Sequence, residues 1–232
     1  MNRLPHSAKK QTEKRIDFMI FNVSDQQAKE SIIEIGKKMY ERGFVASNDG
    51  NISVRVADGI WMTPTGVSKG SMTEDMLIKL DLDGNVICGS YKKSTETPMH
   101  LRVYKEDDSV GAVVHAHSPA AVAFAIARLP LDCSVYPEAL VNLGNVPVAK
   151  YATPGTLDVP DSLAPFVKRG FHAALLANHG PVCWGKNITE AWYRLEALEG
   201  FAKISLYLRQ ISGGVALTDK EISMLGVEIP KN

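Results

Sequence analysis

The sequence of 232 residues lacks an excess of charge of either sign. Lysine and arginine together number 26, aspartate and glutamate also number 26, and the formal net charge at pH 7 is zero. Proteins that bind nucleic acids or anionic membranes normally carry a basic excess or a basic stripe. The charge balance therefore argues against both kinds of partner, whereas a small anionic substrate needs only a local pocket.

Cysteine is scarce, and long apolar runs are missing. The three cysteines, Cys88, Cys133 and Cys183, are an odd number and form no Cys-x-x-Cys spacing, which favours free buried thiols in a reducing compartment. No apolar run approaches the length of a membrane span, and residues 1–15 are polar and basic without an apolar stretch beside a cleavage site. We therefore expect a cytoplasmic protein.

The remaining composition, 45% hydrophobic and 22% charged, is that of an ordinary globular protein with enough apolar residues for a sizeable core. Residues 1–23 are interpreted as an N-terminal extension, in which a basic head precedes a short apolar piece. The extension could pack on the body or on a neighbouring subunit, or it could serve as a targeting or docking peptide. We expect residues 24–232 to form one domain.

Capping residues and hydrophobic periodicity predict the main elements. Helices are expected at residues 24–43, 97–105, 119–127 and 187–211, with Ser24, Thr97, Ser118 and Asn187 as N-caps. Strands are expected at residues 51–56, 59–63, 78–82, 85–88, 111–117 and 173–177. The sequence shows no internal repeat and no linker. It predicts a single-domain α/β fold, in which a central, mostly antiparallel sheet is covered by helices on both sides.

A His-x-His pair, His115 and His117, is the first chemical feature of the chain. Residues i and i+2 of a strand project from the same face, so both imidazoles could reach one ion. On its own, the pair is equally well explained as polar residues at a strand end. His179 ends another predicted strand, and Gly180 after it permits close approach of two backbones.

Three histidines with an open fourth position are the arrangement of a catalytic zinc site. The sequence therefore predicts a metal site with His115, His117 and His179 as ligands. Imidazole suits several divalent metals, so Zn²⁺ is the preferred ion and another divalent metal is possible.

Ser94, Thr95 and Glu96 precede a predicted helix start, where backbone N–H groups favour an anion. The two hydroxyls could bind a phosphate, and Glu96 could act as a general acid/base near the metal or could merely cap the helix. The turns 63–66 and 48–51 could each present an anion-binding nest or could be turns and nothing more.

Several segments occur together in an order that resembles the class II aldolase/adducin-head family, from about residue 24 to residue 208. They are SNDGNIS (47–53), MTPTGVS (62–68), KSTETPMH (93–100), VVHAHSPAA (113–121), AKYATPGT (149–156) and LLANHG (175–180). The sequence looks most like the L-fuculose-1-phosphate aldolase branch. The resemblance implies that residues 24–232 are a class II aldolase-type catalytic domain.

Through this resemblance, specific roles fall on specific residues. It implies Zn²⁺ on His115, His117 and His179, and an acid/base role for Glu96. It implies that the substrate phosphate is bound by Gly50, Asn51, Thr65, Gly66, Ser94 and Thr95. A tyrosine from a neighbouring subunit, which protonates the aldehyde oxygen, falls on Tyr136, within a homotetramer whose active sites lie at subunit interfaces. The implied reaction is cleavage of a ketose 1-phosphate into dihydroxyacetone phosphate and a small aldehyde such as lactaldehyde.

The sequence also departs from that branch. Glu138 is unexpected there and is a rival acid/base, because related dehydratases place a glutamate in this part of the chain. Residues 212–232 contain no tyrosine to close over the substrate. The epimerase branch normally has aspartate at the position of Glu96, which argues against epimerisation. Dehydratase, decarboxylase or 4-epimerase activity on a sugar phosphate stays as the alternative, and a non-catalytic adducin-like module is disfavoured because the histidines are present.

Overall fold

The computed structural model describes residues 23–230, so the predicted N-terminal extension lies, apart from Val23, outside the described residues. A single sheet runs through the domain in the order β4-β3-β2-β1-β5-β8-β7-β6. Its strands are β1 (Asn51–Val56), β2 (Gly59–Met62), β3 (Ile78–Leu80), β4 (Val86–Cys88), β5 (Ala112–His115), β6 (Val148–Ala149), β7 (Ala173–Leu176) and β8 (Gly180–Gly185). Every neighbouring pair is antiparallel except β6 and β7, so the predicted mostly antiparallel sheet is confirmed.

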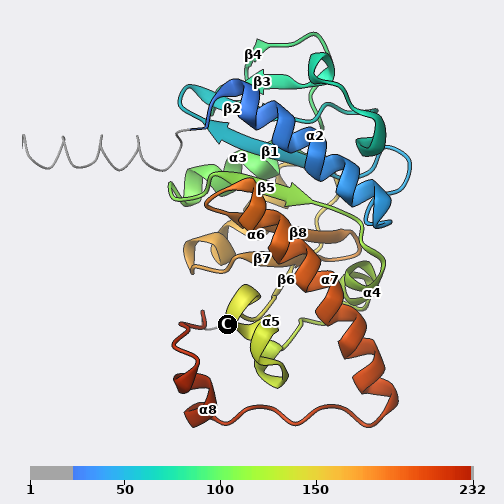
Figure 1. The fold of residues 1–232 in the computed structure, drawn as a ribbon, viewed down its shortest axis with the longest axis vertical. Helices are drawn as coiled ribbons and strands as arrows, with labels where there is room; N and C mark the ends of the chain where they lie inside the picture. Colours follow the sequence, from blue (N-terminus) through green and yellow to red (C-terminus); the bar gives the residue numbers. More distant parts are fainter. Residues whose placement is uncertain (1–22, 231–232) are drawn as a thin grey trace, which may run out of the picture.

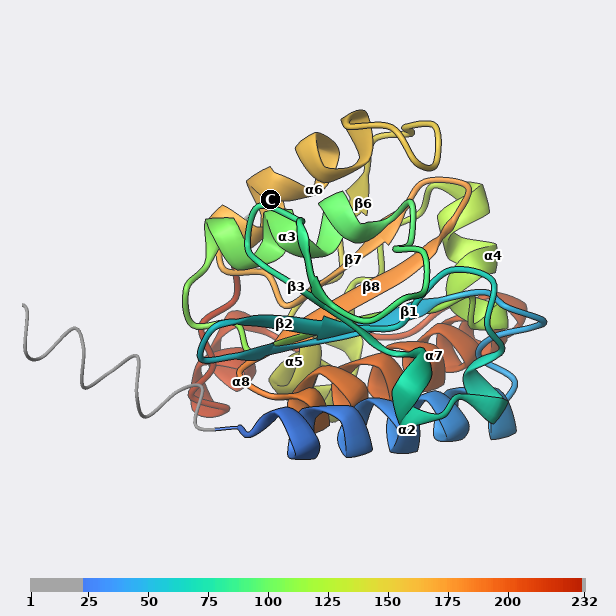
Figure 2. The ribbon, with the colours of Figure 1, turned by 90° about the horizontal axis from the view of Figure 1, so that it is seen from above.

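Helices cover both faces of the sheet, as the sequence predicts (Figures 1 and 2). The helices are α2 (Asp25–Glu41), α3 (Thr97–Glu106), α4 (Pro119–Ala127), α5 (Pro137–Leu143), α6 (Asp158–Lys168), α7 (Ile188–Gln210) and α8 (Asp219–Met224). One core contains the buried faces of α2, α4, α5 and α7, and a second core on the opposite face contains those of α3 and α6. The result is a three-layer α/β/α domain with a core on each side of the sheet.

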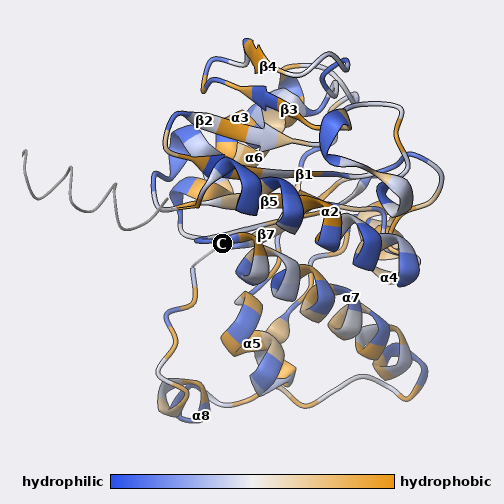
Figure 3. Ribbon diagram, turned by 45° about the horizontal axis from the view of Figure 1, so that its top comes forward, coloured by the Kyte–Doolittle hydropathy of each residue, from blue (hydrophilic) through white to orange (hydrophobic). Residues whose placement is uncertain are grey.

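The predicted caps fix the long helices on the first face. Ser24, the predicted N-cap of α2, forms a capping box with Gln27, and the Asn187 side chain accepts a hydrogen bond from the Glu190 N–H at the start of α7. Hydrophobic residues at helical spacing then turn one side of each helix toward the sheet. In Figure 3, α7 accordingly alternates hydrophilic and hydrophobic stretches along its length.

Several predictions of local structure are wrong. Helix α3 begins at Thr97, so Glu96 and not Thr97 occupies the N-cap position. Strand β5 ends at His115, and His117 lies in the connection between β5 and α4. Strand β8 was not expected at all, and Cys88 is exposed on the edge strand whereas the other two thiols are buried.

No helix among residues 23–230 is long and apolar enough to cross a membrane.

Candidate metal and anion site

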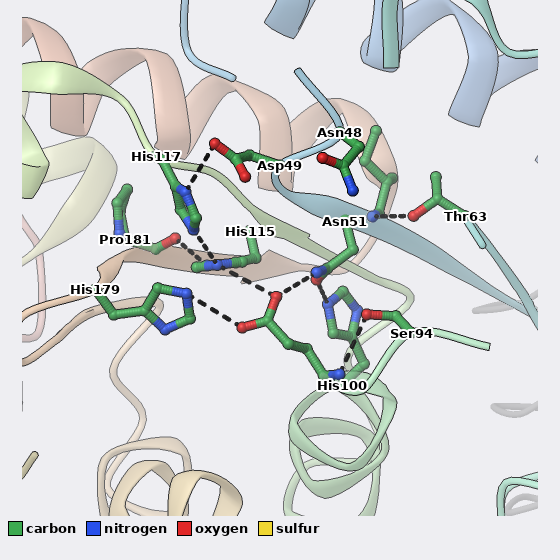
Figure 4. Close-up of polar contacts among 12 residues, drawn as sticks. Asn48, Asp49, Asn51, Thr63, Ser94, His100, His115, His117, His179 and Pro181 are labelled. Carbon is green, nitrogen blue, oxygen red and sulfur yellow. Dashed lines mark hydrogen bonds and ion pairs between the residues drawn. The ribbon is translucent and has the colours of Figure 1, made fainter. Parts of the chain in front are cut away.

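Three histidines from separate segments meet at one end of the sheet (Figure 4). His115 ends β5, His117 lies between β5 and α4, and His179 lies in the turn between β7 and β8. One nitrogen from each ring lies within 4.8 Å of the other two, and the ring centroids are 4.7, 4.9 and 5.1 Å apart. Within residues 23–230 this is the one group of histidine, cysteine or acidic residues with the spacing of a metal site.

Strand β8 explains how His179 reaches the other two. Strands β5 and β7 are not neighbours, because β8 lies between them. Instead, β8 runs antiparallel to β5, and its first residues lie beside the end of β5. Gly180 makes this approach possible, since a Cβ there would lie 2.5 Å from the carbonyl oxygen of Ala116.

A hydrogen bond orients the ring of His115, and a carboxylate lies beside the ring of His117. The Nδ1 of His115 lies 2.8 Å from the carbonyl oxygen of Pro181, which requires a proton on Nδ1 and leaves Nε2 as a free lone pair facing the cluster. The Nδ1 of His117 lies 3.4 Å from a carboxylate oxygen of Asp49, and its Nε2 lies 3.2 Å from the Nε2 of His115. A metal-binding histidine normally has such a partner on its other nitrogen. The donor set therefore fits a divalent ion bound by three imidazoles.

Burial keeps these rings ready to bind a cation. Burial lowers the pKa of His115 to about 3, and it also lowers the pKa of His179. Neutral imidazole is the form that binds metal, so protons compete little with an ion at neutral pH.

Glu96 lies against the same cluster. Its carboxylate oxygens are 3.2 Å from Nε2 of His179 and 3.5 Å from Nε2 of His115, and Asn51 Nδ2 donates to it at 2.5 Å. Although Glu96 is the N-cap of α3, its side chain makes no capping hydrogen bond. Burial raises the pKa of Glu96, but the positive charge that His115 and His179 acquire when they are protonated in acid, together with the Asn51 hydrogen bond, outweighs burial and lowers this pKa to about 2. The side chain is therefore a carboxylate held at the cluster.

Most of the residues expected to bind phosphate line one pocket beside this cluster. The pocket is lined by Asn48, Asp49, Gly50, Asn51, Pro64, Thr65, Ser94, Thr95, Glu96, His117, Pro154 and His179. Gly66 instead borders an adjoining depression with Ser47, Asn48, Ser68 and Tyr40. Ser94 Oγ accepts a hydrogen bond from the Glu96 N–H, so its own hydrogen can be donated to an anion.

In the turn 63–66, one of the backbone amides that an anion-binding nest would need is already used. The Thr65 N–H donates to the carbonyl oxygen of Lys92 at 3.0 Å, so an anion would meet the exposed Thr65 hydroxyl and not this amide. Gly50 and Gly66 both have positive φ, of 71° and 77°, as the interpretation of these two turns requires. A side chain at Gly50 would also lie 2.8 Å from the carbonyl oxygen of His115.

Tyr136 and Glu138 lie away from this pocket. Tyr136 precedes α5 and stacks on Phe201 at a centroid distance of 6.2 Å, and Glu138 is exposed in the first turn of α5. Neither side chain lines the pocket of its own chain.

Lys69 is a buried residue of the site that the sequence interpretation missed. Its Nζ donates to the carbonyl oxygens of Asn48 and Val67 at 3.0 and 2.8 Å, and this joins the two turns that border the pocket. Burial lowers the pKa of Lys69 to about 8, with Asp49 and Glu96 opposing the shift, so the ammonium is charged at neutral pH. No local sequence pattern signals this role, because the two carbonyls belong to different turns.

We expect Lys69→Met to lower the free energy of unfolding by about 1–3 kcal/mol, because two carbonyl oxygens lose their donor in a buried place. The turns at residues 48 and 67 should also separate, and the affinity for a phosphate-bearing ligand should fall. Urea denaturation measures the first effect and titration with inorganic phosphate the second. Lys37→Met is the control, because Lys37 is exposed and its ion pair with Glu41 is 3.8 Å long. Equal stability of both variants would contradict the role of Lys69.

The metal-free protein should lose stability as the pH falls below about 6.5, the ordinary pKa of histidine, because burial lowers the pKa of His100 to about 4. Between these values the unfolded chain binds more protons than the folded one, so the free energy of unfolding falls with pH. His100 accounts for about 3 kcal/mol of the free energy of unfolding, which is lost as the pH falls from about 6.5 to about 4. Urea denaturation of chelator-treated protein at a series of pH values checks this. His100→Gln should make the free energy of unfolding depend less steeply on pH. An unchanged slope in this variant would contradict the contribution of His100.

Residues 30–206 match the family described as Class II Aldolase and Adducin N-terminal domain. The match covers most of the chain and includes every residue of the histidine cluster and of the pocket beside it. The chain therefore belongs to the class II aldolase/adducin family.

Within this family, the chain is similar to enzymes of two kinds. It is 34% identical over 178 residues to an L-fuculose phosphate aldolase of Methanocaldococcus jannaschii, across 77% of this chain and 95% of the relative. It is 35% identical over 190 residues to a 3-oxo-tetronate 4-phosphate decarboxylase of Pectobacterium atrosepticum, across 80% of this chain and 86% of the relative.

Solved structures that resemble this chain belong to the same two kinds of enzyme or bear a title that names both. A structure of L-fuculose 1-phosphate aldolase superposes with a TM-score of 0.81 at 32% identity, covering 88% of this chain and 96% of the other. YgbL of Escherichia coli, described as a putative aldolase/epimerase/decarboxylase, superposes with a TM-score of 0.80 at 32% identity, covering 87% and 99%. The predicted family and fold are thus confirmed.

Proposed function

We propose that residues 24–232 form the catalytic domain of a metal-dependent aldolase that cleaves a ketose 1-phosphate into dihydroxyacetone phosphate and a small aldehyde. L-Fuculose 1-phosphate, or a similar deoxy-pentulose or deoxy-hexulose phosphate, is the substrate we propose, with lactaldehyde as a representative aldehyde. One observation carries the proposal. The carboxylate of Glu96 lies 3.2–3.5 Å from two rings of a three-histidine cluster, in a pocket that also presents the Ser94 and Thr95 hydroxyls.

The ion we propose is Zn²⁺, held by His115, His117 and His179. When bound, a divalent ion supplies Lewis-acid stabilisation of the negative charge that develops on substrate oxygen atoms. The imidazole nitrogens that face the cluster suit zinc, and they also suit other divalent metals.

Glu96 would move the proton at the donor carbon. In the condensation direction, the ionised carboxylate accepts the proton from the carbon of dihydroxyacetone phosphate that forms the new bond. In the cleavage direction, the protonated carboxyl returns it to that carbon. Burial beside the cluster keeps the Glu96 carboxylate close to where the substrate would lie, so little reorganisation is needed.

The phosphate of the substrate would bind to Ser94, Thr95, Thr65 and Asn51, with Gly50 and Gly66 shaping the turns. This binding holds the remote end of the substrate, so that the bond to be cleaved lies beside Glu96. The charge of Lys69, buried below the two turns, favours an anion at the same place.

In a homotetramer with active sites between subunits, Tyr136 would protonate the aldehyde oxygen of the substrate bound at the site of a neighbouring subunit. Its exposed position outside the pocket of its own chain supports this arrangement. Glu138, in the first turn of α5, would approach the same neighbouring site, so it stays a rival for the acid/base role.

Mixing two inactive variants tests the shared site. We expect Glu96→Gln and Tyr136→Phe to be weak alone, whereas tetramers formed by mixing equal amounts after dissociation should regain about one quarter of wild-type activity. In one quarter of the interfaces of random tetramers, an intact Glu96 faces an intact Tyr136. Mixtures that stay as inactive as the separate variants would contradict a site shared between subunits.

A second reaction, decarboxylation of a 3-oxo-tetronate 4-phosphate, is favoured by the 35% identity to the Pectobacterium decarboxylase. Both reactions are tested on the metal-loaded protein. Dihydroxyacetone phosphate is measured with a coupled dehydrogenase on L-fuculose 1-phosphate and its deoxy-pentulose analogues, and carbon dioxide is measured on the tetronate. Formation of dihydroxyacetone phosphate supports the aldolase, and carbon dioxide release without it would replace the proposal by the decarboxylase.

A further inference from the structure

A line of buried polar side chains leads from Glu96 into the core between β1 and α3. The Tyr104 hydroxyl lies 2.7 Å from Ser53 Oγ, which lies 2.7 Å from Nδ1 of His100. On its other side, Nε2 of His100 lies 2.5 Å from Oδ1 of Asn51, and Asn51 Nδ2 donates to Glu96 at 2.5 Å (Figure 4). His100, Ser53 and Tyr104 are at most 1% exposed, so this line ends inside the protein and not in solvent.

Two periodicities place these side chains together. Asn51 and Ser53 are two residues apart on β1, so they project from the same face of the sheet. His100 and Tyr104 are four residues apart on α3, so they lie on the same side of the helix. Asn51 is also paired with His115 across β1 and β5, which sets its amide beside the histidine cluster.

The hydrogen bonds of this line have one consistent direction. Because the Glu96 carboxylate only accepts, Asn51 must turn its Nδ2 toward Glu96 and its Oδ1 toward His100. The Oδ1 only accepts, so Nε2 of His100 must carry a hydrogen. With the buried ring neutral, its Nδ1 is bare and accepts the Ser53 hydroxyl hydrogen, and Ser53 Oγ in turn accepts from Tyr104.

We propose that His100 is a positioning residue: as the neutral Nε2–H tautomer, anchored by Ser53 and Tyr104, it fixes the Asn51 amide that holds Glu96 at the histidine cluster. The Asn51 Nδ2 has two hydrogens and Glu96 takes one. Since Asn51 also lines the pocket, the second hydrogen is left for a substrate oxygen. One amide then links binding of the substrate to the orientation of Glu96. The tautomer is independent of the reaction, whereas its kinetic consequence rests on the proposed function.

Nitrogen NMR of the histidine rings tests the tautomer on the full chain without substrate. The signals of His100 are assigned by their loss in His100→Gln. We expect a protonated Nε2 and a bare Nδ1 that stay unchanged between about pH 6 and about pH 8. Ser53→Ala should shift the Nδ1 signal, because the ring loses the donor there. A proton on Nδ1, or a doubly protonated ring in this pH range, would overturn the proposal.

The kinetic arm compares His100→Leu with His100→Gln at equal metal content. Leucine removes the donor to Asn51, so kcat should fall by about 10- to 100-fold with a smaller change in KM, because Glu96 loses its fixed position. The glutamine amide can place a nitrogen near the position of Nε2, so it should restore most of kcat. Wild-type kcat in His100→Leu, or no recovery in a folded His100→Gln, would overturn the proposal.

The two arms separate this inference from the proposed function. If His100→Leu does not fold, the NMR measurement on the wild-type chain still decides the tautomer. If the chain shows the expected tautomer and cleaves no ketose phosphate, the proposed function is contradicted and the placement of His100 is not.

Discussion

Glu96→Gln is expected to lower kcat for cleavage of the ketose 1-phosphate by about 10²- to 10⁴-fold, the usual contribution of a positioned general acid/base. Glutamine keeps the size of the side chain and can still accept a hydrogen bond from Asn51, but it cannot take up and return a proton. The metal content should stay at the wild-type level, because Glu96 lies beside the three histidines and is not needed to hold the ion. Steady-state kinetics with metal analysis of the same samples measures both.

Two further variants make this result specific. Glu41→Gln is the control, since Glu41 is exposed at the end of α2 and should behave as wild type. Glu138→Gln tests the rival acid/base on α5. A large loss in Glu138→Gln together with near-normal turnover in Glu96→Gln would move the acid/base role to Glu138 and would favour a dehydratase-like reaction.

Removal of the metal is expected to have an effect of at least similar size. Dialysis against a chelator should lower turnover by about 1,000-fold or more, since the Lewis acid supplies several kcal/mol of transition-state stabilisation. Added Zn²⁺ should restore activity. His117→Ala and His179→Ala should each weaken metal binding, because two imidazoles hold an ion less tightly than three.

His172→Ala is the matched control for these histidine variants. His172 is exposed just before β7 and lies outside the cluster. It should keep both full metal content and full turnover. Unchanged turnover of chelator-treated protein with no residual metal would show that the reaction does not depend on an ion.

The parts of the site that the sequence predicts best are those with a local signal. His115 and His117 stand two residues apart at the end of an apolar run, and Glu96 stands directly before a Thr-Pro helix start. Such patterns define local backbone geometry, so the direction of the side chains follows from them. Helices α2, α3, α4 and α7, strands β1 to β5 and β7, and the pocket turns at residues 48–51 and 63–66 could be predicted for the same reason.

Other features have no local signal. Strand β8 contains a proline at its second position, which argues against a central strand, although Pro181 uses its carbonyl group for His115. Helix α6 contains two prolines, at positions 160 and 165, and was missed as well. The contacts of Lys69 and His100 depend on which segments pack together, so only the three-dimensional structure places them.

The most direct test of the three-histidine site is X-ray diffraction from crystals of the zinc-loaded protein, with data collected on both sides of the zinc absorption edge. The account predicts one anomalous peak per chain, about 2.0–2.1 Å from a nitrogen of each of His115, His117 and His179. Diffraction from a His179→Ala crystal should show this peak greatly weakened. A zinc ion bound elsewhere, or one that leaves any of the three rings uncoordinated, would contradict the site on which the proposed reaction rests.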